Sequence, residues 1–193
     1  MELPYRIILA SNSPRRRELL GGLGIDFTVK VIGGIDESWP HDLKGEDIPL
    51  YISREKAAPY KATIAPDELV ITADTIVYVD GEVLGKPADE ADAKRMLRMI
   101  SGRWHEVITG VTLMTAARER SFAVTTKVRF CNLTDDEINR YVESGLPMDK
   151  AGAYGIQEWI GYVGVEAIEG SYFNVVGLPV QRLYRELLNF CKQ

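Results

Sequence analysis

Residues 5–20 read YRIILASNSPRRRELL, which places a short apolar run directly before a helix start. The run over residues 5–10 is apolar, partly β-branched and of strand length. Ser13 and Pro14 then match the residue preferences of an N-cap and of the first helical position. We therefore predict a strand over residues 5–10, followed at once by a helix that ends at the glycines near Leu23. A strand that feeds a helix in this way is typical of an α/β fold.

The rest of the chain mixes helical and strand patterns without an internal repeat. Apolar residues at helical spacing predict helices over residues 47–64, 88–100, 134–144 and after Pro179. Strand-like runs cover residues 27–32, 106–116 and 121–130, and residues 69–79 are expected to form a strand pair interrupted by the polar residues 72–75. Because the two patterns intermix without a strict βαβα order, we expect a mixed, elongated sheet flanked by helices. The prediction is one α/β domain over residues 1–193.

The composition is that of a globular chain, with 46% hydrophobic residues and a net charge of −5. The acidic balance argues against a nucleic-acid partner, although one basic pocket can still hold an anionic small molecule. No stretch approaches 18 consecutive apolar residues, and the charges at the start follow the apolar run rather than precede it. We therefore expect a cytoplasmic protein with no membrane partner.

The turn after the first predicted strand, residues 11–16, carries groups that suit a phosphate ligand. A helix N-terminus presents unpaired N–H groups and a partial positive charge. Ser11 and Ser13 add hydroxyls, and Arg15 and Arg16 add forked donors. Successive helix residues point about 100° apart, so the arginines of this run cannot all reach one ligand. The alternative is a capped surface helix whose arginines face solvent.

Two carboxylates are candidates for chemistry. Asp74 lies within an apolar strand region, where aspartate is disfavoured and is rarely buried unless it is paired or holds a metal. Glu37 lies in a loop that begins at two glycines. Two carboxylates together with substrate phosphates are a usual way to hold Mg²⁺. The alternatives are an aspartate satisfied by backbone donors and a solvated loop acid.

Three further side chains could face a nucleotide. Lys56 lies in SREKA and Lys86 in GKP, and either ammonium could contact phosphates. Gln157 ends the small-residue run AGAYGIQ, and its amide carries both a donor and an acceptor that can read a base edge. The alternatives are two solvated charges and a plain turn.

Six blocks, in this order, resemble the Maf family of nucleoside triphosphate pyrophosphatases. They are SNSPRR (11–16), SREKA (53–57), ADT (73–75), GKP (85–87), SGRWH (101–105) and AGAYGIQ (151–157). The resemblance implies an α/β fold of the Maf and ITPase kind and hydrolysis of a nucleoside triphosphate between its α and β phosphates. It also implies a divalent cation (Mg²⁺, Mn²⁺ or Co²⁺) and a homodimer.

The resemblance also implies roles for particular residues. Asp74 matches the proton-accepting aspartate, and Arg15, Thr75 and Gln157 match the positions that mark the branch acting on dTTP and UTP rather than on 7-methyl-GTP. The resulting expectation is Asp74, Lys56 and Lys86 as catalytic residues, Glu37 and Asp74 as metal ligands, and Ser11, Ser13, Arg15, Arg16, Thr75 and Gln157 as substrate-binding residues. The alternative function is a non-catalytic nucleotide-binding regulator of cell division, which would need the phosphate cradle but not the paired carboxylates.

Overall fold

The structure is a computed structural model that describes residues 3–192; residues 1–2 and 193, at the ends of the predicted domain, lie outside the described residues. The chain forms two compact units. The first unit contains the chain up to Asp74, Thr109–Val124 and the segment from Gly177, and the second contains Thr75–Ile108 and Thr125–Val176. Neither unit is therefore one continuous stretch of sequence.

The strands form a mixed sheet, as the sequence predicted. In the described part of the chain the strand order is β2-β1-β3-β5-β6-β7, with β4 paired to β3. β1 runs parallel to β2 and β3, whereas the β3–β4 and β6–β7 pairs are antiparallel. The strands are β1 (Arg6–Leu9), β2 (Phe27–Val29), β3 (Glu68–Val79), β4 (Glu82–Leu84), β5 (Trp104–Met114), β6 (Glu119–Phe130) and β7 (Val165–Glu169).

Helices account for much of the remaining chain, and the predicted α/β class is confirmed. The α-helices are α1 (Pro14–Gly21), α2 (Asp47–Ala57), α3 (Glu90–Ile100), α4 (Asp135–Glu143), α5 (Trp159–Gly164), α6 (Tyr172–Val176) and α7 (Val180–Lys192). The 3-10 helices are η1 (Ala58–Ala62), η2 (Leu146–Asp149) and η3 (Ala151–Ala153). Among residues 3–192, no helix has the length and apolarity that a membrane crossing requires.

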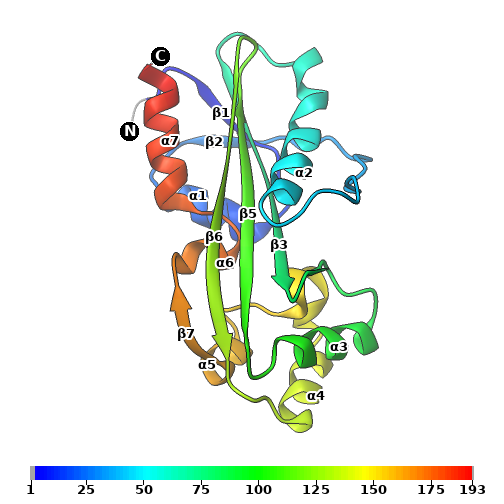
Figure 1. Cartoon of the computed structure of the whole chain (residues 1–193). Coiled ribbons are helices and arrows are strands. Elements are labelled where there is room, and N and C mark those ends of the chain that lie inside the picture. Colours follow the sequence, from blue (N-terminus) through cyan, green and yellow to red (C-terminus); the bar gives the residue numbers. More distant parts are fainter. Residues whose placement is uncertain (1–2, 193) are drawn as a thin grey trace. The chain divides into compact units, whose positions relative to one another are not determined.

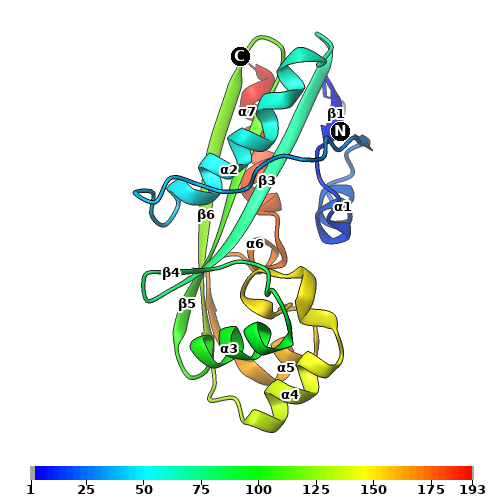
Figure 2. The ribbon, with the colours of Figure 1, turned by 90° about the vertical axis from the view of Figure 1, so that its right-hand side faces the viewer.

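In the first unit, alternate strand residues face two different helices. Ile7 and Leu9 of β1 share a buried cluster with Leu183 of α7, whereas Ile8 packs with Ala57 at the end of α2. This alternation follows from the two-residue period of a strand. Figures 1 and 2 both place α2 and α7 on opposite sides of the strands in this unit. The first unit therefore has three layers, with the strands between α2 and α7.

α2 lies unusually close to β5. A Cβ atom added at Gly110 would lie 2.3 Å from the carbonyl carbon and oxygen of Pro49, so only glycine fits there. Ser53, one turn further along α2, bonds the Thr112 hydroxyl at 2.9 Å, and its carbonyl accepts from Thr72 Oγ1 at 2.6 Å. These contacts fix the helix that carries Lys56 against the strands.

In the second unit, helices α3, α4 and α5 cover one face of the strands. Their apolar residues pack with the buried strand residues Val107 and Phe130. Asp80 and Gly81 join β3 to β4 as a hairpin, and both residues have positive φ, 50° and 85°, for which an Asp-Gly pair is well suited. α4 begins at Thr134 with a full capping box.

β3 differs from the prediction. It is a single strand from Glu68 to Val79, and the polar residues 72–75 do not interrupt it. The hydroxyl of Thr72 is satisfied by the Ser53 carbonyl, and the Asp74 carboxylate is satisfied by the Lys56 ammonium. Polar side chains with partners can remain in a buried strand, which is why the expected break is absent.

His105 should make the stability of the protein fall at acidic pH. The side chain is 2% exposed, and burial lowers the pKa of His105 to about 3. An unfolded histidine takes up a proton below about pH 6.5, but the folded one does not. This contribution to stability is therefore present above pH 6.5 and is lost as pH falls toward 3, by up to about 1.4 kcal/mol per pH unit.

Urea unfolding between pH 7.5 and 4.5 would check this dependence. The His105→Gln variant should show a shallower loss of stability than the parent, because other titrating groups contribute equally to both. His41 is exposed, so His41→Gln should keep the parent slope. Equal slopes for the parent and His105→Gln would contradict the assignment.

Candidate active site

Two carboxylates and one ammonium converge in the first unit. Lys56 Nζ lies 2.7 Å from Asp74 Oδ1 and 3.1 Å from Glu37 Oε2. The Lys56 and Asp74 side chains are 15% and 12% exposed, whereas that of Glu37 is 58% exposed. The structure thus brings together three of the predicted site residues, two of them nearly enclosed and one facing solvent.

Each of these residues is positioned by a different element. Lys56 is in the last turn of α2, the helix that Gly110 allows close to β5. Asp74 lies on β3 two residues after Thr72, so both side chains face α2, where Thr72 bonds the Ser53 carbonyl. Glu37 reaches the pair from the loop between β2 and α2. The cluster therefore depends on packing between segments far apart in the sequence.

The donor set suits a divalent cation. Oxygens of Asp74 and Glu37 approach one point, which the Lys56 ammonium occupies. Two carboxylates, with phosphate oxygens and water completing the shell, are the ligands that Mg²⁺ prefers. Within residues 3–192 no three His, Cys, Asp or Glu side chains cluster tightly enough to hold a metal without further ligands. The residues present fit a cation that is shared with a phosphate substrate.

The start of α1 lies in the same unit and is built as the sequence predicted. Ser13 is the N-cap, and its hydroxyl accepts from the Arg16 N–H at 3.4 Å. Ser11 is buried, and its hydroxyl accepts from the Ser13 N–H at 3.2 Å. Each hydroxyl keeps its own proton to donate, so both can still bond a phosphate oxygen. Arg15 is half-buried at the first turn of the helix.

Arg16 is tied to the backbone. Its Nε donates to the Gly177 carbonyl at 2.9 Å, and its Nη1 donates to the Ala73 carbonyl at 2.8 Å. Desolvation lowers the pKa of Arg16, and the negative charges of Asp74 and Glu37 partly oppose that shift. The sequence did not suggest this contact, because Ala73 and Gly177 are distant from Arg16 in the chain. Arg16 thus holds the residue immediately before Asp74.

The second unit holds the remaining predicted residues. Lys86 is exposed on the segment after β4, and the carbonyl of the preceding Gly85 accepts from the Gly152 N–H at 3.0 Å. This bond joins the Lys86 segment to the run that carries Gln157. Thr75 follows Asp74 on β3, and its side chain points to the opposite face of the strand, shared with Val77. Val77 contacts the position of Gly152, where a Cβ would lie 2.7 Å away.

Gln157 has an unusual environment. It lies in a turn between η3 and α5, and its Oε1 is buried without a hydrogen-bond partner among the described residues. A buried acceptor without a partner costs about 1–3 kcal/mol. The arrangement is therefore suited to a ligand that brings its own donor.

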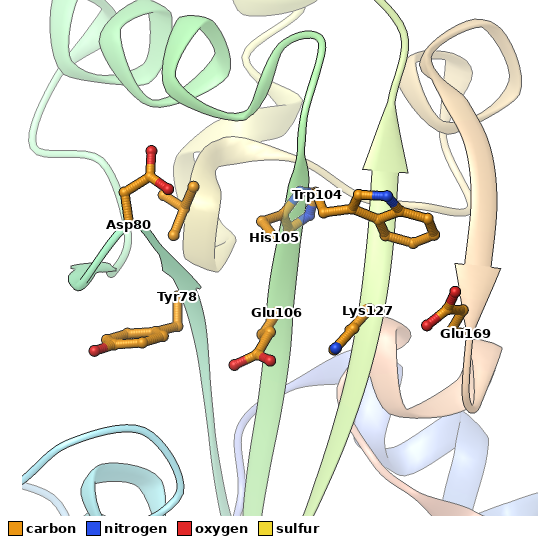
Figure 3. Close-up of a pocket in the computed structure, with 8 residues that line it drawn as sticks. Tyr78, Asp80, Trp104, His105, Glu106, Lys127 and Glu169 are labelled. Carbon is orange, nitrogen blue, oxygen red and sulfur yellow. The ribbon is translucent and has the colours of Figure 1, made fainter.

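A separate cavity of about 450 Å³ lies on the strands of the second unit. Figure 3 shows Tyr78, Glu106, Lys127 and Glu169 in a row across β3, β5, β6 and β7. Trp104 and Asp80 lie beyond one side of this row (Figure 3). None of the predicted site residues lines this cavity, so it is distinct from the candidate site.

Comparison with known proteins identifies a family whose model matches this chain and relatives of high sequence identity. The family model described as "Maf-like protein" matches residues 6–190. Proteins named dTTP/UTP pyrophosphatase are 62% identical in Phocaeicola vulgatus and 58% in Parabacteroides distasonis, with 95% and 96% of each chain covered. A relative with the same name in Porphyromonas gingivalis is 50% identical and covers 96% of this chain and 94% of its own.

The fold also resembles that of solved structures. The Ham1 protein of Staphylococcus aureus gives a TM-score of 0.53 at 17% identity, with 94% of this chain and 99% of that chain covered. The HAM1 protein of Coxiella burnetii gives 0.50 at 15% identity, covering 96% and 99%. At this level of identity the likeness concerns the fold alone.

Proposed function

The chain belongs to the Maf family, and on that premise we propose that it is a pyrophosphatase that hydrolyses dTTP and UTP to the monophosphate and pyrophosphate. Its relatives at 50–62% identity carry the corresponding name over nearly their whole length. The proposal includes a cytoplasmic location, which is the expectation from the sequence pattern, and a homodimer, which rests on the family resemblance.

The observation that carries the proposal is the cluster of Glu37, Lys56 and Asp74. A protein that only binds a nucleotide needs cations for the phosphates but has no need of two carboxylates beside them. Asp74 is nearly enclosed and lies 2.7 Å from an ammonium, where a carboxylate can accept a proton while the cation neutralises nearby charge. This arrangement supports hydrolysis over the alternative of a non-catalytic regulator.

In the proposed reaction, Asp74 orients a water molecule and accepts its proton as the oxygen attacks the α phosphorus. The new O–P bond forms as the bond between the α phosphorus and the bridging oxygen breaks, and pyrophosphate leaves. Lys56, Lys86 and Arg15 stabilise the charge that builds on the phosphate oxygens, together with the N-terminus of α1. A divalent cation held by Glu37 and Asp74 would neutralise further phosphate charge. Ser11, Ser13 and Arg16 bind the phosphates, and the backbone bonds of Arg16 also hold the residue before Asp74.

Gln157 and Thr75 are proposed to read the base. Uracil and thymine present an N3–H donor beside a carbonyl oxygen. The buried Oε1 of Gln157 would accept from N3–H while its amide donates to the carbonyl. With the amide in this orientation, cytosine would place its unprotonated N3 opposite the amide oxygen and its amino group opposite the amide NH₂, so neither hydrogen bond would form. A good bidentate pair discriminates between bases by about 1–3 kcal/mol, a factor of about 5–150.

Pyrophosphate release from dTTP, UTP, CTP, GTP and 7-methyl-GTP tests the function and the base reading together. We expect turnover of dTTP and UTP that needs Mg²⁺ or Mn²⁺ and is lost with a chelator. In Gln157→Ala the preference for UTP over CTP should fall by about 10-fold, within the range of a bidentate pair. Gln181 is exposed on α7, so Gln181→Ala should keep the parent preference.

Two outcomes would contradict this proposal. Turnover of 7-methyl-GTP in place of dTTP and UTP would overturn the roles of Arg15, Thr75 and Gln157. Nucleotide binding measured by calorimetry, without turnover of any nucleotide, would favour the regulator.

A further inference from the structure

Three side chains of the second unit form a buried polar network. The Tyr141 hydroxyl donates to Glu158 Oε2 and accepts from the Gly155 N–H, the latter at 3.0 Å. Lys150 Nζ lies 2.8 Å from Glu158 Oε1 and donates to Asp149 Oδ1 at 2.7 Å. The lysine is 7% exposed, although lysine is almost never buried unless it is paired. The network therefore joins α4 to both ends of one short segment.

That segment is the run that carries Gln157. Lys150 lies directly before residues 151–157, and Glu158 lies directly after them, so their ion pair closes the run into a loop. Gly155 is packed against the pair: a Cβ there would lie 2.7 Å from Glu158 Cδ and 2.9 Å from Lys150 Cε. The side chains of Glu158 and Lys150 thus pack closely against the backbone two residues before Gln157.

The backbone of this run does not adopt its locally preferred conformation. Gly152 and Ala153 both have positive φ, 69° and 58°. A left-handed conformation costs an alanine about 1–2 kcal/mol and persists only where surrounding contacts impose it. Exchanging a buried ion pair for apolar residues often leaves stability unchanged, so this ion pair need not be present for the stability that it adds.

We propose that Tyr141, Glu158 and Lys150 are positioning residues that hold Gln157 in place and thereby set the base selectivity of the site. The proposal rests on the base-reading role of Gln157 given above. None of the three needs to touch the substrate. We expect removal of the Tyr141 hydroxyl to disturb the run most, because this one group bonds both Glu158 of the ion pair and the Gly155 backbone. Burial and the hydrogen bond to Glu158 raise the pKa of Tyr141, so its hydroxyl remains a donor throughout the neutral range.

Tyr141→Phe is the most conservative test, because it removes one hydroxyl and leaves the ion pair intact. Losing hydrogen bonds of this kind should raise KM for UTP by about 3- to 10-fold and lower the UTP-over-CTP preference by a similar factor, with kcat changed less than about twofold. In the Gln157→Ala background the same change should leave the preference unaltered, since a positioning residue acts only through the residue it positions. Amide hydrogen exchange over residues 151–157 should become faster.

Tyr60→Phe is the matched control. Tyr60 is a buried tyrosine of the first unit whose hydroxyl likewise makes two hydrogen bonds, here both to backbone groups: the Lys30 carbonyl at 2.7 Å and the Ile32 N–H at 3.0 Å. It should lose similar thermal stability without changing the UTP-over-CTP preference or the exchange of residues 151–157.

The outcomes separate the two proposals. Unchanged exchange over residues 151–157 in Tyr141→Phe would overturn the positioning role, whatever the protein hydrolyses. Faster exchange with an unaltered preference, or an equal effect in the Gln157→Ala background, would overturn the link to selectivity. A parent protein that hydrolyses neither UTP nor dTTP would overturn the proposed function, which the exchange measurement does not depend on.

Discussion

Asp74→Asn should reduce turnover of dTTP and UTP by about 10²- to 10⁴-fold, the usual contribution of a positioned proton acceptor. An amide of the same shape neither accepts the proton from water nor carries the negative charge that pairs with Lys56. Binding of the nucleotide should weaken far less, because the donors at the start of α1 remain in place. The effect should therefore appear in kcat rather than in KM, and pyrophosphate release at several substrate concentrations would separate the two.

A carboxylate outside the cluster provides the control. Asp67 also forms an ion pair in the first unit, with Arg6 Nε at 2.7 Å, and its side chain is 60% exposed. Asp67→Asn makes the same chemical change and should leave kcat unaltered. If Asp74→Asn kept full turnover while remaining folded in a thermal melt, the proposed mechanism would be wrong.

Gly110→Ala should lower the free energy of unfolding by about 3 kcal/mol or more, the upper part of the range for overpacked cores. The added methyl would lie 2.3 Å from backbone atoms of Pro49, and no rotamer change can relieve a clash with backbone. Any protein that still folds must move α2 away from β5. Since α2 carries Lys56, that displacement should also reduce turnover.

Gly33→Ala separates this clash from the general effect of replacing a glycine. No atom lies within 4 Å of the position a Cβ would take at Gly33, and its φ is not positive. The variant should match the parent or gain a few tenths of a kcal/mol from a less flexible unfolded chain. Urea unfolding of both variants measures the difference. Equal stabilities would show that α2 can move without cost and would contradict the account of its packing.

The elements that begin or turn at distinctive local residues could be predicted from the sequence. Ser13 with Pro14, Thr134 and the Asp80–Gly81 pair each act through neighbouring backbone groups, so a short window of sequence contains their cause. β3 was predicted wrongly for the opposite reason. Its polar residues are satisfied by α2, and a contact with a distant helix leaves no trace in the local pattern.

In the candidate site, too, features with a local cause could be predicted, whereas features that depend on contacts between distant segments could not. The residue types of Glu37, Lys56 and Asp74 could be identified individually, but their convergence depends on how three separate segments pack. The network around Lys150 and Glu158 could not be predicted at all. Both residue types are ordinarily exposed, and nothing in their spacing indicates a buried pair.

The division of the chain has a consequence for how the protein is made on the ribosome. Every segment of the second unit has been synthesised once Val176 is reached, but the first unit still lacks its last segment. Ile7 and Leu9 are synthesised long before α7, yet they share a buried cluster with Leu183 of that helix. The unit that bears Asp74 is therefore completed last. A nascent chain that stops before α7 leaves that apolar surface exposed to aggregation or proteolysis and has no assembled catalytic cluster.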